Sequence, residues 1–219
     1  MQRSYPHYYQ RPDVGHLGVD EDATRLDGYS GRFTINKQNG NFQFNAAFGF
    51  ISPGFDSTDM GFQWGGDVFN WHIMAGYRYF KKWGIIKNWQ VNVLTQRNYD
   101  FDWNLIGDQR LILIANVTFT NYWSVYGQMS HNPERWNKTG TRGGPMMKQK
   151  TYTWFDWGIQ SDSRNSVVFS FGGFHQISDW GTEEHSANIG FRWKPGSKFN
   201  IYVSANFNDT QQNSQWITN

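Results

Sequence analysis

The sequence predicts an all-β protein: a transmembrane, antiparallel, up-and-down β-barrel with about ten strands present, as part of a larger barrel. Three observations predict this class. Aromatic residues make up 19% of the 219 residues, with 12 Trp, 11 Tyr and 18 Phe. Apolar and polar residues alternate with period two in repeated runs of strand length. The connections between these runs alternate between short and longer, as the periplasmic turns and outer loops of outer-membrane barrels do.

The composition is polar as a whole although its aromatic content is high, and its mean hydropathy is negative. A barrel with an apolar outer band and a polar lumen reconciles the two. No run of about 20 apolar residues could form a transmembrane helix. The absence of Cys excludes disulfides, thiolate metal sites and a Cys nucleophile. The net charge of +2, without a clustered basic face, excludes a nucleic-acid partner.

Ten runs are expected as strands, most of them about 9–12 residues long, which is enough to cross a bilayer at a tilt. Their apolar stripes are Phe42–Phe50, Phe69–Tyr79, Trp89–Val93, Leu111–Phe119, Trp123–Met129, Thr153–Ile159, Val167–Gly173, Ala187–Trp193 and Phe199–Phe207, with a weaker strand near Arg25–Lys37. We therefore divide the chain into an N-terminal segment with an acidic loop (1–24), the barrel strands (25–209), and an outer loop or truncated tail (210–219). Within the first part, Ser4–Gln10 is a candidate for one more strand.

The order of the connections supports a barrel over a soluble sandwich. Short turns are expected at Asn39–Gly40, Lys81–Gly84, Asn121–Tyr122, Ser161–Asn165 and Lys194–Lys198. Longer connections are expected at Ile51–Gly65, Asn104–Asp108, His131–Lys150 and Ile177–Glu184. Asn-Gly is a strong hairpin signal. A soluble sandwich has no reason to alternate short and longer connections in this way.

Aromatic residues cluster beside the short turns, where a lipid-facing girdle is expected at the membrane interface. The predicted girdle residues are Tyr79, Trp89, Phe119, Trp123, Trp193 and Phe199. The alternative is that they are ordinary core residues at hairpin ends. The recurrence of the cluster at several turns favours the girdle.

The ends of the sequence predict a segment of a larger barrel. With the longer loops outside, the last strand runs outward, and the chain ends in Trp216–Asn219 without the aromatic last residue of a complete barrel. The N-terminus has no apolar core of a signal peptide. We therefore expect further strands after Asn219 and further sequence before Met1.

Three motifs resemble a family of bacterial outer-membrane barrels of unassigned function, in which a family-9-like carbohydrate-binding domain precedes the barrel. The motifs are Ser52–Phe62, Gly76–Phe80 and Arg142–Met146, within a similarity that spans Asp27 to Phe207. The resemblance implies a barrel and an outer-membrane location. Asp56–Asp59 departs from the acidic-Val-Asn-Asp form of the family, and the carbohydrate-binding domain is absent from this sequence. Sugar binding is therefore carried over to no residue.

No set of residues has the spacing of a catalytic, cofactor or metal site, so we assign none. The six His residues lack zinc-binding spacings. Asp56, Asp59 and Asp67 could bind calcium, although Asx-turns in a polar loop explain them better. A Ser–His pair that includes His72 or His175 would support lipid hydrolysis, but no serine partner can be named.

The loop His131–Lys150 supplies the candidates for ligand contact: Arg135, Trp136 and Arg142. Arg135 and Trp136 could stack on a sugar or could simply anchor the loop. The glycine-rich Arg142–Pro145 segment indicates a tight loop that folds over or into the lumen, as loop plugs of barrels do.

Three functions are consistent with the sequence. The first is an outer-membrane barrel that serves as a channel, receptor or scaffold, with a link to glycan handling that rests on the resemblance. The second is an outer-membrane barrel enzyme that acts on lipids, and the third is a soluble β-protein that binds polysaccharide through aromatic residues. We expect no enzymatic activity and no cofactor. The expected partners are outer-membrane lipid and a glycan or other envelope proteins.

Overall fold

Each predicted run of alternating residues forms a strand in the computed structural model, which describes residues 1–213. The strands of the main sheet are β1 (Ser30–Lys37), β2 (Phe42–Ile51), β3 (Val68–Tyr79), β4 (Ile86–Tyr99), β5 (Arg110–Phe119), β6 (Ser124–Asn132), β9 (Tyr152–Gln160), β10 (Val167–Ser178), β11 (Glu183–Gly196) and β12 (Phe199–Gln211). The loop between β6 and β9 adds a small hairpin, β7 (Arg135–Asn137) with β8 (Met147–Gln149). No helix in the described residues is long and apolar enough to cross a membrane.

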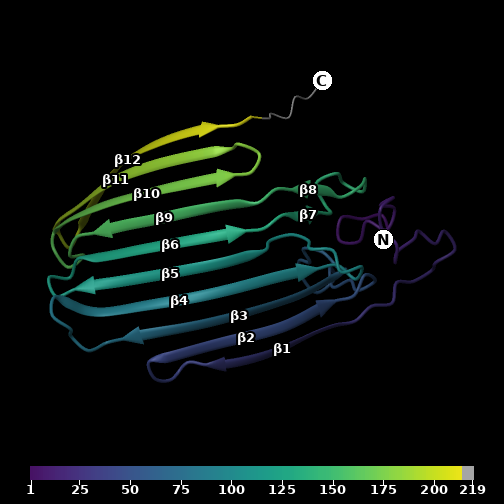
Figure 1. Ribbon diagram of the computed structural model, residues 1–219, viewed down its shortest axis with the longest axis horizontal. Coiled ribbons are helices and arrows are strands. Elements are labelled where there is room, and N and C mark those ends of the chain that lie inside the picture. Colours follow the sequence, from purple (N-terminus) through teal and green to yellow (C-terminus); the bar gives the residue numbers. More distant parts are fainter. Residues whose placement is uncertain (214–219) are drawn as a thin grey trace.

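The ten strands lie side by side in chain order, each antiparallel to the next (Figure 1). This arrangement confirms the all-β, antiparallel, up-and-down fold. Within residues 1–213, the edge strands β1 and β12 pair with one neighbour each and not with one another. The sheet is therefore not closed, which is consistent with part of a larger barrel.

The two faces of the sheet differ in chemistry as the alternation predicts. On one face, which we call the apolar face, large side chains such as Leu113 and Phe171 are 47% and 40% exposed. On the other, the polar face, His72 of β3 contacts the Asn45 side-chain oxygen of β2 at 2.5 Å. The largest fully buried side chains are all polar: Ser130 and Asn132 lie in β6, and Asp67, Asp100 and Gln109 lie in loops next to the strand ends. This distribution is the inverse of that in water-soluble proteins.

The predicted short turns lie together at one end of the sheet, and cation–π contacts join the β5–β6 turn to β4 and to the β9–β10 turn. Tyr122, in the β5–β6 turn, has φ 63°, a conformation that non-glycine residues rarely adopt. Its ring lies 3.7 Å from Lys87 Nζ and 3.1 Å from Arg164 Cζ. Asp162 accepts a 2.9 Å hydrogen bond from Arg164 Nε, and this bond lowers the pKa of Asp162 to about 2. These contacts stabilise the strained turn.

Two details of the predicted connections are wrong. Ser4–Gln10 forms turns, with both His7 N and Tyr8 N donating to Ser4 O at 3.0 Å, and not an extra strand. The expected longer connection Ile177–Glu184 is a tight turn, because β10 continues to Ser178 and β11 starts at Glu183. Ser178 N donates to Thr182 O at 2.9 Å across it. The alternation of short and longer connections therefore ends at β9.

The boundaries of the strand region also shift. β1 begins at Ser30 and β12 continues to Gln211, so the strands occupy 30–211 in place of the predicted 25–209. The predicted tail from 210 thus begins inside β12. Residues 214–219 of this tail lie outside the described residues, so its role stays a prediction.

Candidate functional site at the long-loop end

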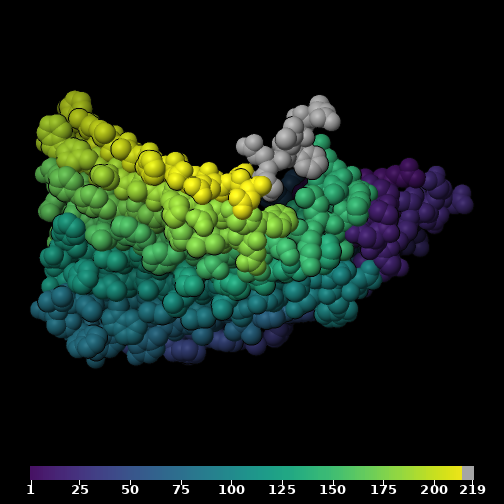
Figure 2. Space-filling view, turned by 45° about the horizontal axis from the view of Figure 1, so that its top comes forward, coloured from purple at the N-terminus to yellow at the C-terminus, as the bar shows by residue number. Residues whose placement is uncertain are grey.

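The longer loops and the N-terminus meet at the end of the sheet opposite the short turns (Figures 1 and 2). We call this assembly the cap. It consists of the N-terminal segment 1–29, the β2–β3 loop 52–67, the β4–β5 loop 100–109 and the β6–β9 loop 133–151. Figure 2 shows the purple N-terminal segment packed beyond the strand ends, next to the green β6–β9 loop. The cap is where the structure gathers most of its buried charges.

Hydrogen bonds that involve backbone N–H groups join the N-terminal segment to the loops. Gly66 N donates to Pro6 O at 2.9 Å, and Met146 N donates to the Asp13 carboxylate at 2.5 Å. Gly15 N donates to the Asp102 carboxylate at 3.0 Å. Each bond joins the segment to a different loop. The segment is therefore a strap that crosses all three loops.

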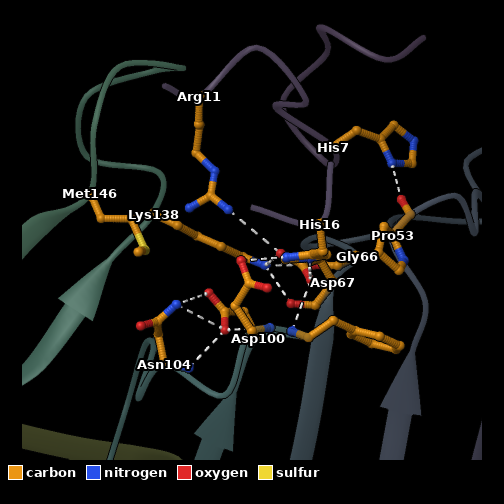
Figure 3. Close-up of polar contacts among 12 residues, drawn as sticks. His7, Arg11, His16, Pro53, Gly66, Asp67, Asp100, Asn104, Lys138 and Met146 are labelled. Carbon is orange, nitrogen blue, oxygen red and sulfur yellow. Dashed lines mark hydrogen bonds and ion pairs between the residues drawn. The ribbon is translucent and has the colours of Figure 1, made fainter. Parts of the chain in front are cut away.

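Asp67 lies at the centre of the cap and is 2% exposed (Figure 3). Its carboxylate is 2.7 Å from His16 Nε2, 3.4 Å from Lys138 Nζ and 3.6 Å from Arg11 Nη2. It also accepts a 3.1 Å hydrogen bond from Phe101 N. One buried carboxylate thus joins cationic side chains from the N-terminal segment and from the β6–β9 loop.

Lys138 brings the β6–β9 loop onto the other loops. Its ammonium donates to Gly66 O at 2.7 Å and to Asp67 O at 2.6 Å. Burial lowers the pKa of Lys138, and the charge of Asp67 opposes this shift. In the same loop, Trp136 N donates to Leu105 O at 2.7 Å, and Trp136 O accepts from Gly107 N at 3.0 Å. The loop is therefore anchored against the β4–β5 loop.

Asp100 shapes the β4–β5 loop and is fully buried. Its carboxylate accepts hydrogen bonds from Asn104 N at 2.8 Å and from Asp102 N at 3.0 Å. The Asn104 side-chain amide adds a bond at 3.0 Å. This local turn places Asp102 beside His16, whose Nδ1 is 2.7 Å away.

His16 links Asp67 and Asp102, and its pKa reflects both contacts. Partial burial lowers the pKa of His16, but the hydrogen bond to Asp102 and the charge of Asp67 outweigh burial, so the pKa rises above 6.5. The hydrogen bond to His16 in turn lowers the pKa of Asp102 below 3.8. The ion pairs of His16 thus need an imidazolium and two carboxylates.

The docking of the N-terminal segment is therefore expected to depend on pH. A raised His pKa stabilises docking below the unfolded value of 6.5, and this contribution is lost as the pH rises through the folded value. The lowered pKa of Asp102 stabilises docking above 3.8 and is lost as the pH falls through its folded value. The protection factors of residues 1–29 against hydrogen exchange, which correct for the pH dependence of the intrinsic rate, should be highest between these limits. In the variant His16→Gln, protection should no longer fall as the pH rises through this range. An unchanged fall would contradict the role of His16 in docking.

The second histidine of the segment, His7, contacts Pro53 O at 2.9 Å and Asp56 at 3.3 Å. Asp56 accepts hydrogen bonds from the Thr58 hydroxyl and Thr58 N, and these lower the pKa of Asp56 to about 2. The loop thus forms the Asx-turn that the sequence favoured. Residues 1–213 contain no group of three metal-ligating side chains, so the calcium hypothesis for Asp56, Asp59 and Asp67 gains no support.

The three predicted ligand-contact residues lie apart. Arg135, in β7, is buried, with its guanidinium 4.9 Å from the Tyr152 ring. Trp136 lies under Lys148 Nζ at 5.8 Å. Arg142 is exposed in a turn with φ 54°. The structure does not gather them into one site, and their contact with a ligand stays a prediction.

The six predicted girdle residues lie at the short-turn end. Tyr79 and Trp89 are paired across β3 and β4 with ring centroids 6.2 Å apart. Trp123, Trp193 and Phe199 are 38%, 43% and 67% exposed. Phe119 is the last residue of β5 and lies on the apolar face, as Leu113 does. Their positions are compatible with a girdle, and their contact with lipid stays a prediction.

The histidines give no support to a lipid hydrolase. His131 contacts the Thr153 hydroxyl at 2.9 Å, and His175 contacts His185 at 2.9 Å. In the described part of the chain, no histidine forms a hydrogen bond with a serine hydroxyl; the other partners are main-chain or Asp and Asn oxygens. The sequence left open which face of the sheet His175 lies on. In the structure His175 pairs with His185 and lies on the same face as Phe171, which is the apolar face.

The residues that build the cap could not be recognised from the sequence. Arg11 and Lys138 stand in loops without periodicity, His16 was considered only for zinc, and Asp67 only for calcium. A weak signal existed in the N-terminal segment, where Arg11, Asp13 and His16 follow an aromatic run. Nothing in the spacing pairs them with partners more than 50 residues away.

The curved antiparallel sheet, with one apolar and one polar face, defines a protein with a porin-like β-barrel fold. Residues 9–219 match the family model described as a domain of unknown function (DUF5916), and the chain belongs to this family. A search of curated proteins gives no match. The match confirms the expected family of unassigned function, but it does not show the link to a carbohydrate-binding domain.

Two solved structures are similar to the chain. A porin refined at high resolution gives a TM-score of 0.57 at 15% identity, covering 92% of this chain and 63% of the porin. The chain thus spans less than two thirds of the length of that porin. The KdgM porin gives a TM-score of 0.32 at 14% identity, covering 84% of this chain and 86% of that one. At this identity the first likeness shows the fold alone, and the second carries no argument.

Proposed function

We propose that the sheet is part of the wall of a β-barrel in the bacterial outer membrane. In this proposal the barrel acts as a channel or receptor for polar solutes, and the cap covers its mouth. The observation that carries the proposal is the inverted distribution of side chains. Apolar side chains are exposed along the strands, whereas the fully buried large side chains are polar. A bilayer would cover the apolar face with hydrocarbon and leave the polar face to a lumen.

A soluble polysaccharide binder fits this distribution less well. It would need the apolar stripes in a core and one flat aromatic platform on the surface. The exposed apolar residues are instead spread over the strands, from Phe33 in β1 to Phe207 in β12. In water such a continuous apolar surface would drive aggregation.

Membrane lipid is the first partner that we infer, through the apolar face and the predicted girdle. A glycan or other envelope proteins are further proposed partners. The link to glycan handling rests on the resemblance to barrels that follow a carbohydrate-binding domain. The polar face supports it to the extent that amide groups such as those of Asn92 and Asn116 suit hydroxyl-bearing solutes.

The test is fractionation of cells that produce the protein, followed by conductance in planar bilayers. We expect the protein in the outer membrane after a urea wash and a shift in gel mobility on boiling, because a barrel keeps its strand pairs until it is unfolded. Stepwise conductance would identify a channel, and insertion without conductance would identify a receptor or scaffold. A soluble, non-shifting band would overturn the membrane proposal and favour the polysaccharide binder.

A further inference from the structure

A cleft of about 240 Å³ lies between the β7–β8 hairpin and the ends of β9 and β10, apart from the Asp67 cluster. Tyr152 and Gln176, on the polar face of β9 and β10, line it on one side. Arg135 and Gln149 line it from the hairpin, and Trp180 lines it from the β10–β11 turn. Its volume is just below the range of about 300–1,000 Å³ that is usual for drug-sized ligands. The cleft therefore suits a solute of about one sugar ring.

Arg135 is the unusual group in this cleft because it is 8% exposed and forms no ion pair with any carboxylate of residues 1–213. Its Nε and Nη1 atoms are buried without a hydrogen-bond acceptor in the described residues. The ring of Tyr152, 4.9 Å from the guanidinium, is its stabilising neighbour. A buried cation without a partner is costly, and a guanidinium forms strong charge-assisted hydrogen bonds with carboxylate or phosphate oxygens. Arg135 is thus prepared for an anion.

The charges around Arg135 favour an anion as well. The β6–β9 loop 133–151 holds five basic residues and one acidic residue, Glu134. Glu134 is bound by Lys148 at 2.5 Å and by Lys150 at 3.0 Å, and both lysines lower its pKa. Glu184 pairs with Gln176 across β10 and β11 but does not line the cleft. No carboxylate that lines the cleft therefore competes for Arg135.

The other lining groups suit a hydroxylated ring. Trp180 is 48% exposed, and Tyr152 lies on the wall of the cleft, so the cleft offers two aromatic side chains for stacking. The side-chain amides of Gln149 and Gln176 also line the cleft, and amides can both donate to and accept from hydroxyl groups.

We propose that this cleft binds a small hydroxylated solute that carries a carboxylate or phosphate group, such as an anionic sugar. Arg135 binds the anionic group, and the aromatic and amide groups contact the hydroxylated ring. This inference rests on the proposed function in one respect, since the cleft opens to the lumen only if the polar face lines a barrel.

The experiment is a titration of the full chain in detergent with sodium glucuronate, glucose 6-phosphate and glucose, followed by calorimetry and tryptophan fluorescence. At least one anionic sugar should bind at least about tenfold more tightly than glucose, because hydrogen bonds to charged groups are worth about 1.5–3 kcal/mol. Comparing glucuronate with glucose 6-phosphate distinguishes a carboxylate from a phosphate ligand. No binding, or equal binding of all three sugars, would overturn the proposal.

Variants of the β6–β9 loop test whether the anionic sugar binds at Arg135. Arg135→Gln should lose the preference for the anionic sugar, whereas Arg142→Gln, the same change at an exposed position of the same loop, should keep it. Retention of the preference in Arg135→Gln would overturn the assignment. If Arg135→Gln does not give the heat-shifted band of the folded chain, Trp180→Leu decides. Weaker binding of the anionic sugar in that variant supports the cleft, and unchanged binding overturns it.

Conductance and insertion measured on the same samples separate the two proposals. A protein that inserts and conducts but does not distinguish anionic sugars overturns the cleft alone. A protein that does not insert overturns the barrel proposal, and the titration in detergent still decides the cleft.

Discussion

Replacing Asp67 by Asn is expected to release the N-terminal segment from the loops, at a cost of about 3–5 kcal/mol to the stability of the cap. Asn has the same size and can still accept the hydrogen bond from Phe101 N. It cannot balance the charges of Arg11, His16 and Lys138, which lie 2.7–3.6 Å from the carboxylate. The side chain of Arg11 is 1% exposed and that of Lys138 is 18% exposed, so the cost of leaving them without a counter-charge exceeds that of a lost surface ion pair.

Hydrogen exchange of residues 1–29 and 133–151 measures this effect, with the β-strands as an internal reference. Asp59→Asn is the matched control, because Asp59 is exposed in the same β2–β3 loop. The double variant Asp67→Asn, Arg11→Met should recover part of the protection, since it removes a buried cation whose guanidinium nitrogens form no hydrogen bond within residues 1–213. Unchanged exchange in Asp67→Asn would show that the backbone bonds alone hold the cap together.

The strands could be predicted because a sheet with two chemically different faces requires apolar and polar residues to alternate along each strand. The period of two is visible within a single strand, as in Phe42–Phe50, and does not depend on distant partners. All ten strands of the main sheet were recovered in this way. The prediction was wrong at the ends of β10 and β11: the expected longer connection Ile177–Glu184 overlaps both strands, which continue beyond the paired His175 and His185. In the structure the two rings stack with centroids 4.4 Å apart.

The cap could not be predicted because its contacts are not local. The bond between His16 and Asp67 joins residues 51 positions apart, and the bond from Met146 N to Asp13 joins residues 133 positions apart. Loop residues that meet in this way share no periodicity, and each has a local interpretation as a solvated charge or a turn former. The β7–β8 hairpin was missed for a related reason, since its strands Arg135–Asn137 and Met147–Gln149 are too short to show alternation.

Replacing Leu113 by Arg tests the membrane proposal at the level of one side chain. Leu113 lies in β5 between Val93 of β4 and Met129 of β6, and all three are exposed on the apolar face. If this face contacts the hydrocarbon core, the substitution should cost about 2–4 kcal/mol. Reversible folding into phospholipid vesicles, followed through a denaturant titration, measures this change in the free energy of unfolding.

Asn116→Arg is the matched control, three residues along the same strand but on the polar face beside Gln90 and Tyr126. Its cost should be much smaller, because a lumen keeps the new guanidinium in water. The comparison separates the membrane barrel from a soluble protein by the size of the cost at Leu113. In a soluble protein, an Arg at the half-exposed Leu113 would change stability by no more than about 0.5 kcal/mol. Equal costs at the two positions would contradict the assignment of the faces, and with it the argument from inverted burial.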